Sequence, residues 1–192
     1  MNHMKKMLLL ASALLAVCAC TQKQADPVAE AIVAEMMKDI DQPYDIRVYD
    51  LSRLDSTSFA TEFQRRIGIY DIRLDQNMTL FEKYVNEGMT TNATRKYEAL
   101  KRDTKIYNEL NVMKEMMGDD TLKTAYYDYA FTYKGTVGGH KIAPKKAFAT
   151  VTPDGRVLTY AADRKDLHKA TGLVIPGYKE LLDSFKETAA EE

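Results

Sequence analysis

The sequence predicts an α+β domain in which a curved antiparallel sheet of about four strands packs on helices. Apolar residues repeat at helix spacing through two long central segments, and shorter segments on either side alternate apolar and polar side chains as strands do. Because the two helical segments follow one another between the first and second expected strands, we expect a long antiparallel helical hairpin inserted there, over residues 55–117.

The first two elements are expected to be a helix and a strand. Asp26 suits the N-cap of a helix and Pro27 its first turn, and the helix should end near Gln42-Pro43. The segment 44–54 then alternates β-branched and aromatic residues with polar ones, which is typical of a strand.

The helical hairpin is predicted from two stripes of apolar side chains. The first stripe runs through residues 58–89 with a mean step of about 3.7 residues, close to the helix period. Gly68 weakens the helix prediction locally, and residues 67–72 could instead form a short strand. The second stripe, which ends near Gly118, has near-heptad spacing and comprises Ala93, Tyr97, Leu100, Thr104, Tyr107, Leu110 and Met113.

Three more strands and a final helix are expected after Gly118. The strands are predicted over residues 126–134, 141–152 and 156–161, and Pro153-Asp154-Gly155 has the residues of a tight turn between the last two. Pro144 should lie at a sheet edge or bulge because it cannot donate a backbone hydrogen bond. A helical turn is expected over residues 164–171, and the last helix should begin near Pro176-Gly177.

This order of elements resembles the cystatin-like and nuclear-transport-factor-like cone folds, which wrap a sheet around a helix. The resemblance covers about half of the chain, and the long hairpin departs from it.

The N-terminus has the three parts of an export signal. Lys5 and Lys6 precede an apolar run over residues 7–17, and small residues precede a cysteine. The run is about half the length that a membrane-spanning helix needs. We therefore expect a signal peptide over residues 1–19, a tether over 20–27, and a single α+β domain over 28–192.

The segment Val17-Cys18-Ala19-Cys20 resembles the lipobox of bacterial lipoproteins, in which a small residue precedes the lipidated cysteine. Ala19 suits that position before Cys20 better than Val17 does before Cys18, so the resemblance implies lipidation of Cys20, with Cys18 as the alternative. An ordinary secretory signal is also open. Either reading exports the chain.

Lipidation implies a membrane partner and a place in the bacterial cell envelope. The residues after Cys20 lack the early acidic run that some Gram-negative gut anaerobes use to send lipoproteins to the cell surface. By resemblance to that sorting rule, we expect the outer membrane with the domain facing the periplasm, and the cell surface is the alternative. Without Lys5 and Lys6, 25 basic residues stand against 28 acidic ones, which gives no support for nucleic-acid binding.

The sequence carries none of the common catalytic or cofactor motifs. A phosphate-binding glycine loop, paired-cysteine metal ligands and a nucleophile elbow are all absent, so we expect no metal site and no cofactor. His140 and His168 are the only histidines after the signal peptide. We expect His140 to be an exposed loop residue.

An aromatic row in the strand 126–134 is the best candidate for ligand binding. Its members lie on one face of the strand and are Tyr127, Tyr129, Phe131 and Tyr133. They could line a ligand pocket, or simply pack against a helix and neighbouring strands. Asp128 faces the opposite way, where Tyr160 or Arg156 could complete a polar site.

Two short segments resemble the motif of a general O-glycosylation system in gut anaerobes. They are Asp55-Ser56-Thr57 and Asp120-Thr121-Leu122, which makes Ser56 and Thr121 the candidate acceptors. The alternatives are a helix cap at Ser56 and a turn at Thr121.

Together these features predict a lipid-anchored envelope protein that binds a ligand through the aromatic row or a protein partner through the helical hairpin. A small envelope enzyme that uses Asp128, His140 or tyrosines as acid and base is one alternative. A structural envelope subunit is the other.

Overall fold

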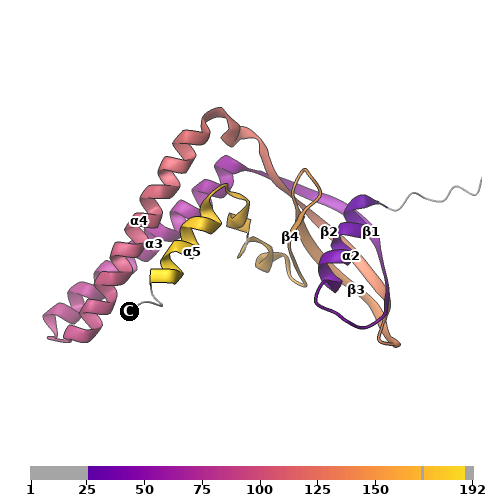
Figure 1. Ribbon diagram of the computed structural model, residues 1–192, viewed down its shortest axis with the longest axis horizontal. Coiled ribbons are helices and arrows are strands. Elements are labelled where there is room, and N and C mark those ends of the chain that lie inside the picture. The colour runs from indigo at the N-terminus through magenta and orange to yellow at the C-terminus, as the bar shows by residue number, and fades with distance from the viewer. Residues whose placement is uncertain (1–25, 170, 189–192) are drawn as a thin grey trace, which may run out of the picture.

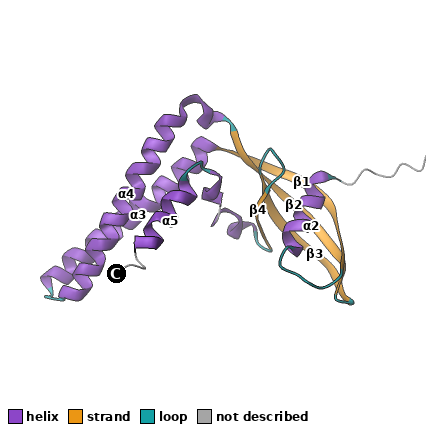
Figure 2. Cartoon of the chain, in the orientation of Figure 1, coloured by secondary structure: helices purple, strands orange, loops and turns teal. Residues whose placement is uncertain are grey.

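The computed structural model describes residues 26–169 and 171–188 and has an α+β fold, as predicted. Its sheet has four antiparallel strands in the order β1-β2-β3-β4 (Figure 2). The regular elements are α2 (Pro27–Met37), β1 (Tyr44–Ser58), α3 (Phe59–Asn86), α4 (Thr90–Met117), β2 (Thr124–Val137), β3 (His140–Val151), β4 (Val157–Ala161) and α5 (Tyr178–Thr188). Three 3₁₀ segments are η1 (Gly118–Leu122), η2 (Arg164–Lys169) and η3 (Thr171–Val174). The predicted signal peptide, Cys18 and Cys20 lie outside the described residues.

Helix α2 lies against one face of the sheet (Figure 1). The backbone N–H of Val28 donates to Asp26 Oδ1 over 2.9 Å, so Asp26 is the N-cap, and Pro27 already belongs to the helix. Ile32 is fully buried against Phe131 and the small side chains of β3. These contacts form the smaller of two apolar cores.

Strand β1 is longer than the sequence predicts. It continues through residues 55–58, which were expected to open the helical hairpin, because each of them pairs with β2: Asp55 lies opposite Asp128, and Ser58 opposite Thr124. Polar residues fill this stretch, so its side chains gave no strand pattern. The helical part therefore begins at Phe59.

Helices α3 and α4 lie side by side, follow β1 in the chain and precede β2 (Figure 1). Ser58 caps α3, since the backbone N–H of Thr61 donates to its hydroxyl over 3.2 Å. Gly68 lies inside the helix, so the alternative of a strand over residues 67–72 is wrong. Helix α5 packs along the hairpin, and the larger core joins both helices to the sheet through Phe63, Leu110, Tyr126, Ile175 and Tyr178.

A buried carboxylate joins the two long helices away from that core. Asp103 of α4 is fully buried and accepts from Arg73 Nε over 3.1 Å and from the second Arg73 nitrogen over 3.0 Å. Asn77 and Arg102 donate to the same carboxylate. This paired, charge-assisted contact sets how far α3 can slide along α4.

The strands β2 and β3 are joined by a tight turn. Gly138 and Gly139 both have positive φ, 55° and 80°, which a two-residue turn of this hand requires. The turn is shorter than expected, because Gly135 still belongs to β2. Pro144 lies within the register shift of β3 between Ile142 and Lys145, as its missing N–H predicts.

Replacement of Asp103 by alanine should lower the free energy of unfolding by about 1.5–3 kcal/mol, the range for hydrogen bonds to a charged group. Chemical denaturation followed by circular dichroism measures the change. Glu98→Ala is the matched control, because Glu98 bonds only to exposed Lys101 among its described contacts. Equal effects of the two substitutions would contradict a clamp at Asp103.

Candidate functional site

A polar cluster lies under the face of the sheet opposite α2, where β2 meets the first turn of α3. Its centre is Glu62, whose side chain is 0% exposed. Glu62 accepts from Arg66 Nε over 2.7 Å and from Arg65 over 2.5 Å, both from the next turn of the same helix. The carboxylate is therefore held by two cations and is removed from water.

Tyr126 of β2 connects this carboxylate to η2. Its hydroxyl donates to Glu62 Oε2 over 2.8 Å, accepts from Arg65 over 2.5 Å, and lies 3.2 Å from His168 Nδ1. Burial and the neighbouring Glu62 charge raise the pKa of Tyr126, so it acts here as a neutral hydroxyl. Three elements thus meet at one phenol.

The second half of the cluster is the pair of His168 and Asp128. His168 Nε2 lies 3.4 Å from Asp128 Oδ2, and Arg164 lies 3.8 Å from the same oxygen. Arg164 also lies 3.7 Å from Asp55, the residue opposite Asp128 in the sheet. The Asp128 side chain is buried, whereas that of His168 is 28% exposed, so the imidazole is the part of the pair that solvent reaches.

The contact between His168 and Asp128 is favourable when the pair shares one proton. The Tyr126 proton goes to Glu62, so Nδ1 of His168 must carry a hydrogen to bond the phenol oxygen. In a neutral imidazole of this form, Nε2 carries only a lone pair, which would repel an ionised Asp128. A proton on either Nε2 or the Asp128 carboxyl removes this repulsion. Burial raises the pKa of Asp128 and lowers the pKa of His168, and both shifts favour a carboxylic acid beside a neutral imidazole.

The structure brings together only part of the predicted polar site. Asp128 meets His168 and Arg164, whereas Tyr160 is paired with Ala149 and lies on the opposite face of the sheet. The backbone N–H of Arg156 donates to the Thr152 hydroxyl over 3.0 Å, in the turn between β3 and β4. His140 is exposed, as expected, but it is not a loop residue: it begins β3 and pairs with Val137 of β2. Glu62, Arg65 and Arg66 were not predicted as site residues. Their spacing of three and four residues indicates a helical ion pair but does not reveal its burial.

The aromatic row faces α2 and is largely used in packing. Phe131 is buried, and Tyr129 and Tyr133 are half-buried in the same core. Tyr127 is half-buried and carries the Arg53 guanidinium 4.9 Å from its ring centre. Tyr129, Phe131 and Tyr133 therefore form a wall beneath α2 instead of an open platform.

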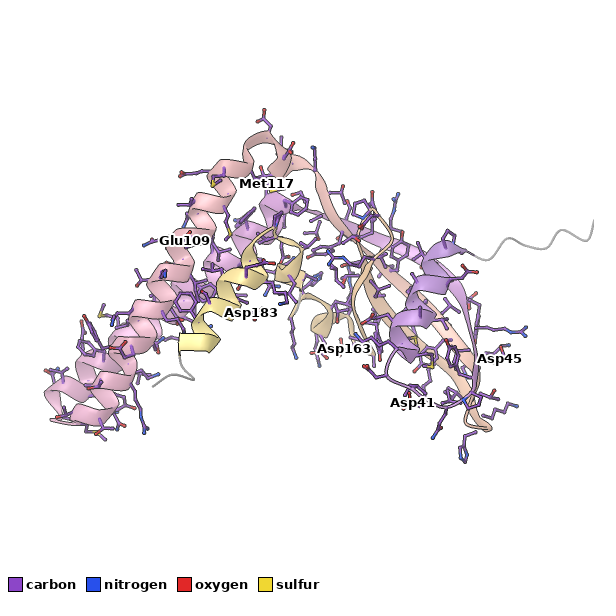
Figure 3. The ribbon with its side chains drawn as sticks, viewed as in Figure 1. Asp41, Asp45, Glu109, Met117, Asp163 and Asp183 are labelled. Carbon is purple, nitrogen blue, oxygen red and sulfur yellow. The ribbon has the colours of Figure 1, made fainter. Side chains whose placement is uncertain are left out.

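A groove opens beside this wall, between α2 and β1. It has a volume of about 1120 Å³ and is lined by both elements. On the helix, the lining consists mostly of small or short side chains, and on the strand it runs from Tyr44 to Leu51. Asp45, which neighbours this lining, lies at the end of the sheet remote from the helical hairpin, and Asp163 lies between the two parts of the molecule (Figure 3).

The two candidate glycosylation sites differ in exposure. Ser56 is exposed on β1, and the helix cap is Ser58 instead of Ser56. Thr121 is buried, and its hydroxyl donates to the carbonyl of Gly118 over 2.8 Å. Ser56 is thus the acceptor that an enzyme could reach without local unfolding.

Across residues 26–169 and 171–188, no three histidine, cysteine or acidic side chains are grouped as metal ligands would be. The helices of this same part are all too short or too polar to cross a membrane.

Comparison with protein-family models, with curated proteins and with solved structures finds no match to this chain. The resemblances to lipoproteins and to cone folds remain predictions from sequence.

The polar cluster predicts a dependence of stability on pH. Burial raises the pKa of Asp128 in the folded chain above its ordinary value of 3.8. The protonated carboxyl is therefore favourable to the fold at low pH, and this contribution to the free energy of unfolding is lost as the pH rises. Asp128→Asn removes the titration. The free energy of unfolding of the variant should therefore rise relative to that of the unchanged protein as the pH increases above 3.8, as measured by urea denaturation.

Asp154→Asn provides a control of opposite sign. A hydrogen bond from Thr152 lowers the pKa of Asp154, so this carboxylate stabilises the fold above pH 3.8 and its contribution is lost as pH falls. The variant should therefore lose stability relative to the unchanged protein as pH rises through that lower range. A flat difference for Asp128→Asn would show that Asp128 is not held protonated.

Proposed function

We propose that this protein is a lipid-anchored bacterial envelope protein that binds a ligand in the groove between α2 and β1, without catalysis. The groove is the observation that carries the proposal. Its volume of about 1120 Å³ is at the upper end of ligand sites, and it combines apolar walls with a few polar groups.

The position of the groove also supports the proposal. Asp26 lines one end of it and is six residues from Cys20 in the sequence. A ligand held there would lie close to the proposed anchor. The outer membrane, with the domain facing the periplasm, is the proposed location.

Anchorage is tested by replacing the cysteines one at a time in the native host. Cys20→Ser should release the protein from the membrane into the soluble fraction of the envelope, whereas Cys18→Ser should leave it membrane-bound. Membrane fractionation with intact-mass measurement of the acylated N-terminus detects the difference. Release by Cys18→Ser alone would assign the lipid to Cys18, and membrane retention of both variants would contradict lipid anchorage.

Ligand binding is tested by filling the groove. Ala34 is exposed on α2 and lines the groove, so Ala34→Trp should expel the ligand without disturbing the core. The protein purified from its own membranes should carry a ligand in native mass spectrometry, and the variant should lose at least about nine-tenths of it, a change of about 1.4 kcal/mol in binding. Ala162→Trp, exposed outside the groove, is the matched control.

The same experiment separates the groove from the polar cluster. A ligand that survives Ala34→Trp and is lost in His168→Gln would place binding at His168. That outcome would favour the alternative of a small enzyme, because an exposed imidazole beside a buried carboxyl can move protons.

The hairpin offers a second surface, for a protein partner. A hollow of about 590 Å³ lies on it beyond the reach of the main core, lined by Met78, Phe81, Tyr97 and neighbours on α4. We rank it below the groove because it is smaller and carries long lysine side chains along its rim.

A further inference from the structure

We propose that the groove takes an extended, basic peptide segment of a partner protein, which adds to the edge of β1 as a further strand of the sheet. This inference rests on the proposed function and names its ligand class. It depends on the free edge of β1, on the shape of the groove and on its charge.

The edge of β1 is open over a regular length. In the part of the chain that the structure describes, β1 has a neighbouring strand on one side only, because the sheet order places it outermost. Tyr44 to Tyr49 lie opposite Val137 to Thr132 without a register shift. Six residues of strand present about 20 Å of backbone donors and acceptors to a new strand.

The free edge of β1 forms one side of the groove, so the groove is not confined to one face of the sheet. Its lining residues on β1 are consecutive from Ile46 to Leu51, so they alternate between the two faces: Ile46 and Val48 face α2, and Arg47 and Tyr49 face away. Ala29, Val33 and Ala34 form the opposite wall. A chain entering here would pair with backbone and place every second side chain against short helix side chains, as in known strand addition.

The edge is held in place from behind. A Cβ on Gly135 would lie 1.8 Å from the carbonyl oxygen of Asp45, so only glycine allows β2 to approach β1 this closely. The N–H of Gly138 donates to the carbonyl of Pro43 over 2.8 Å. Because β1 is already ordered, binding requires little further ordering of this wall.

Asp50 ends the regular edge. It has φ of 53°, the only positive φ among the described residues other than glycine, and β1 shifts register directly after Tyr49. A bulge at this point stops pairing, so the added segment should span about six residues.

The charge of the groove selects a basic segment. Asp26, Glu30 and Asp50 line it, against one cation, Arg47, which itself lies 3.4 Å from Asp45. A second copy of this chain would bring the same carboxylates into the same space and be repelled. A segment with lysine or arginine at alternate positions is favoured.

The test uses the full chain, purified from its membranes in detergent, and four labelled hexapeptides. The probes are acetylated and amidated (Lys-Val)₃, (Glu-Val)₃ as its acidic counterpart, and two forms of (Lys-Val)₃ with alternate amides N-methylated. Fluorescence anisotropy measures their binding. One methylated form should bind at least about tenfold more weakly than the parent and the other within about twofold, because alternate amides point to opposite sides of a strand.

Charge recognition is tested with paired variants. Glu30→Gln combined with Asp50→Asn should weaken binding of (Lys-Val)₃ by about three- to tenfold at low salt, within the range of two exposed charge pairs. Asparagine tolerates the positive φ of residue 50. Glu98→Gln, which neutralises one carboxylate on the distant hairpin, should leave binding unchanged.

Several outcomes would overturn the inference. Failure of (Lys-Val)₃ to bind, equal binding of both methylated forms, or equal binding of (Glu-Val)₃ would each exclude strand addition of a basic segment. If (Lys-Val)₃ fails while Ala34→Trp still expels a native ligand, groove binding stands and the peptide class is wrong. Self-association that Ala34→Trp abolishes would identify a second copy as the occupant.

Discussion

The orientation of the sheet relative to the helical hairpin depends on one buried charge, the carboxylate of Glu62. A carboxylate removed from water must have its oxygens fully bonded, and here the partners come from α3, β2 and η3: Arg66, Tyr126 and Thr171. Arg66 also donates to the carbonyl of His168 over 2.6 Å, which fixes η2. At Gly172 a Cβ would lie 2.6 Å from Arg66 Nε, so a larger residue there would force the guanidinium to shift. The sheet, the hairpin and the C-terminal segments therefore share a single polar junction.

Much of the fold follows from periodicity in the sequence. The stripes through Phe59 and Ala93 predict α3 and α4, and the turn at Pro153-Asp154-Gly155 predicts the connection from β3 to β4. The end of β1 did not follow, because residues 55–58 are polar and their strand conformation comes from pairing with β2. Local side-chain patterns carry no information about a distant partner strand. The same cause moved the helix cap from Ser56 to Ser58.

The candidate sites were less predictable than the fold. Alternation along β2 correctly separated Asp128 from the aromatic row, since it depends only on strand geometry. The partners of Asp128 come from η2, a 3₁₀ segment with no periodic pattern, and only the closed fold brings His168 to it. The groove depends on where α2 lies across the sheet, which no residue of either wall specifies alone. Sequence therefore predicted which side chains share a face, but not which faces meet.

The long hairpin makes the molecule elongated, with α2 at one end and the tip of the hairpin at the other (Figure 1). Each of the two helices has 28 residues and is about 42 Å long, and their free ends lie at the opposite end of the molecule from α2 (Figure 1). A six-residue link from Cys20 to Asp26 spans at most about 20 Å. On the proposed anchorage, the groove would stay near the lipid headgroups, whereas the tip of the hairpin could reach much farther from the membrane surface. One tethered chain could thereby span the distance between something at the membrane surface and something deeper in the compartment.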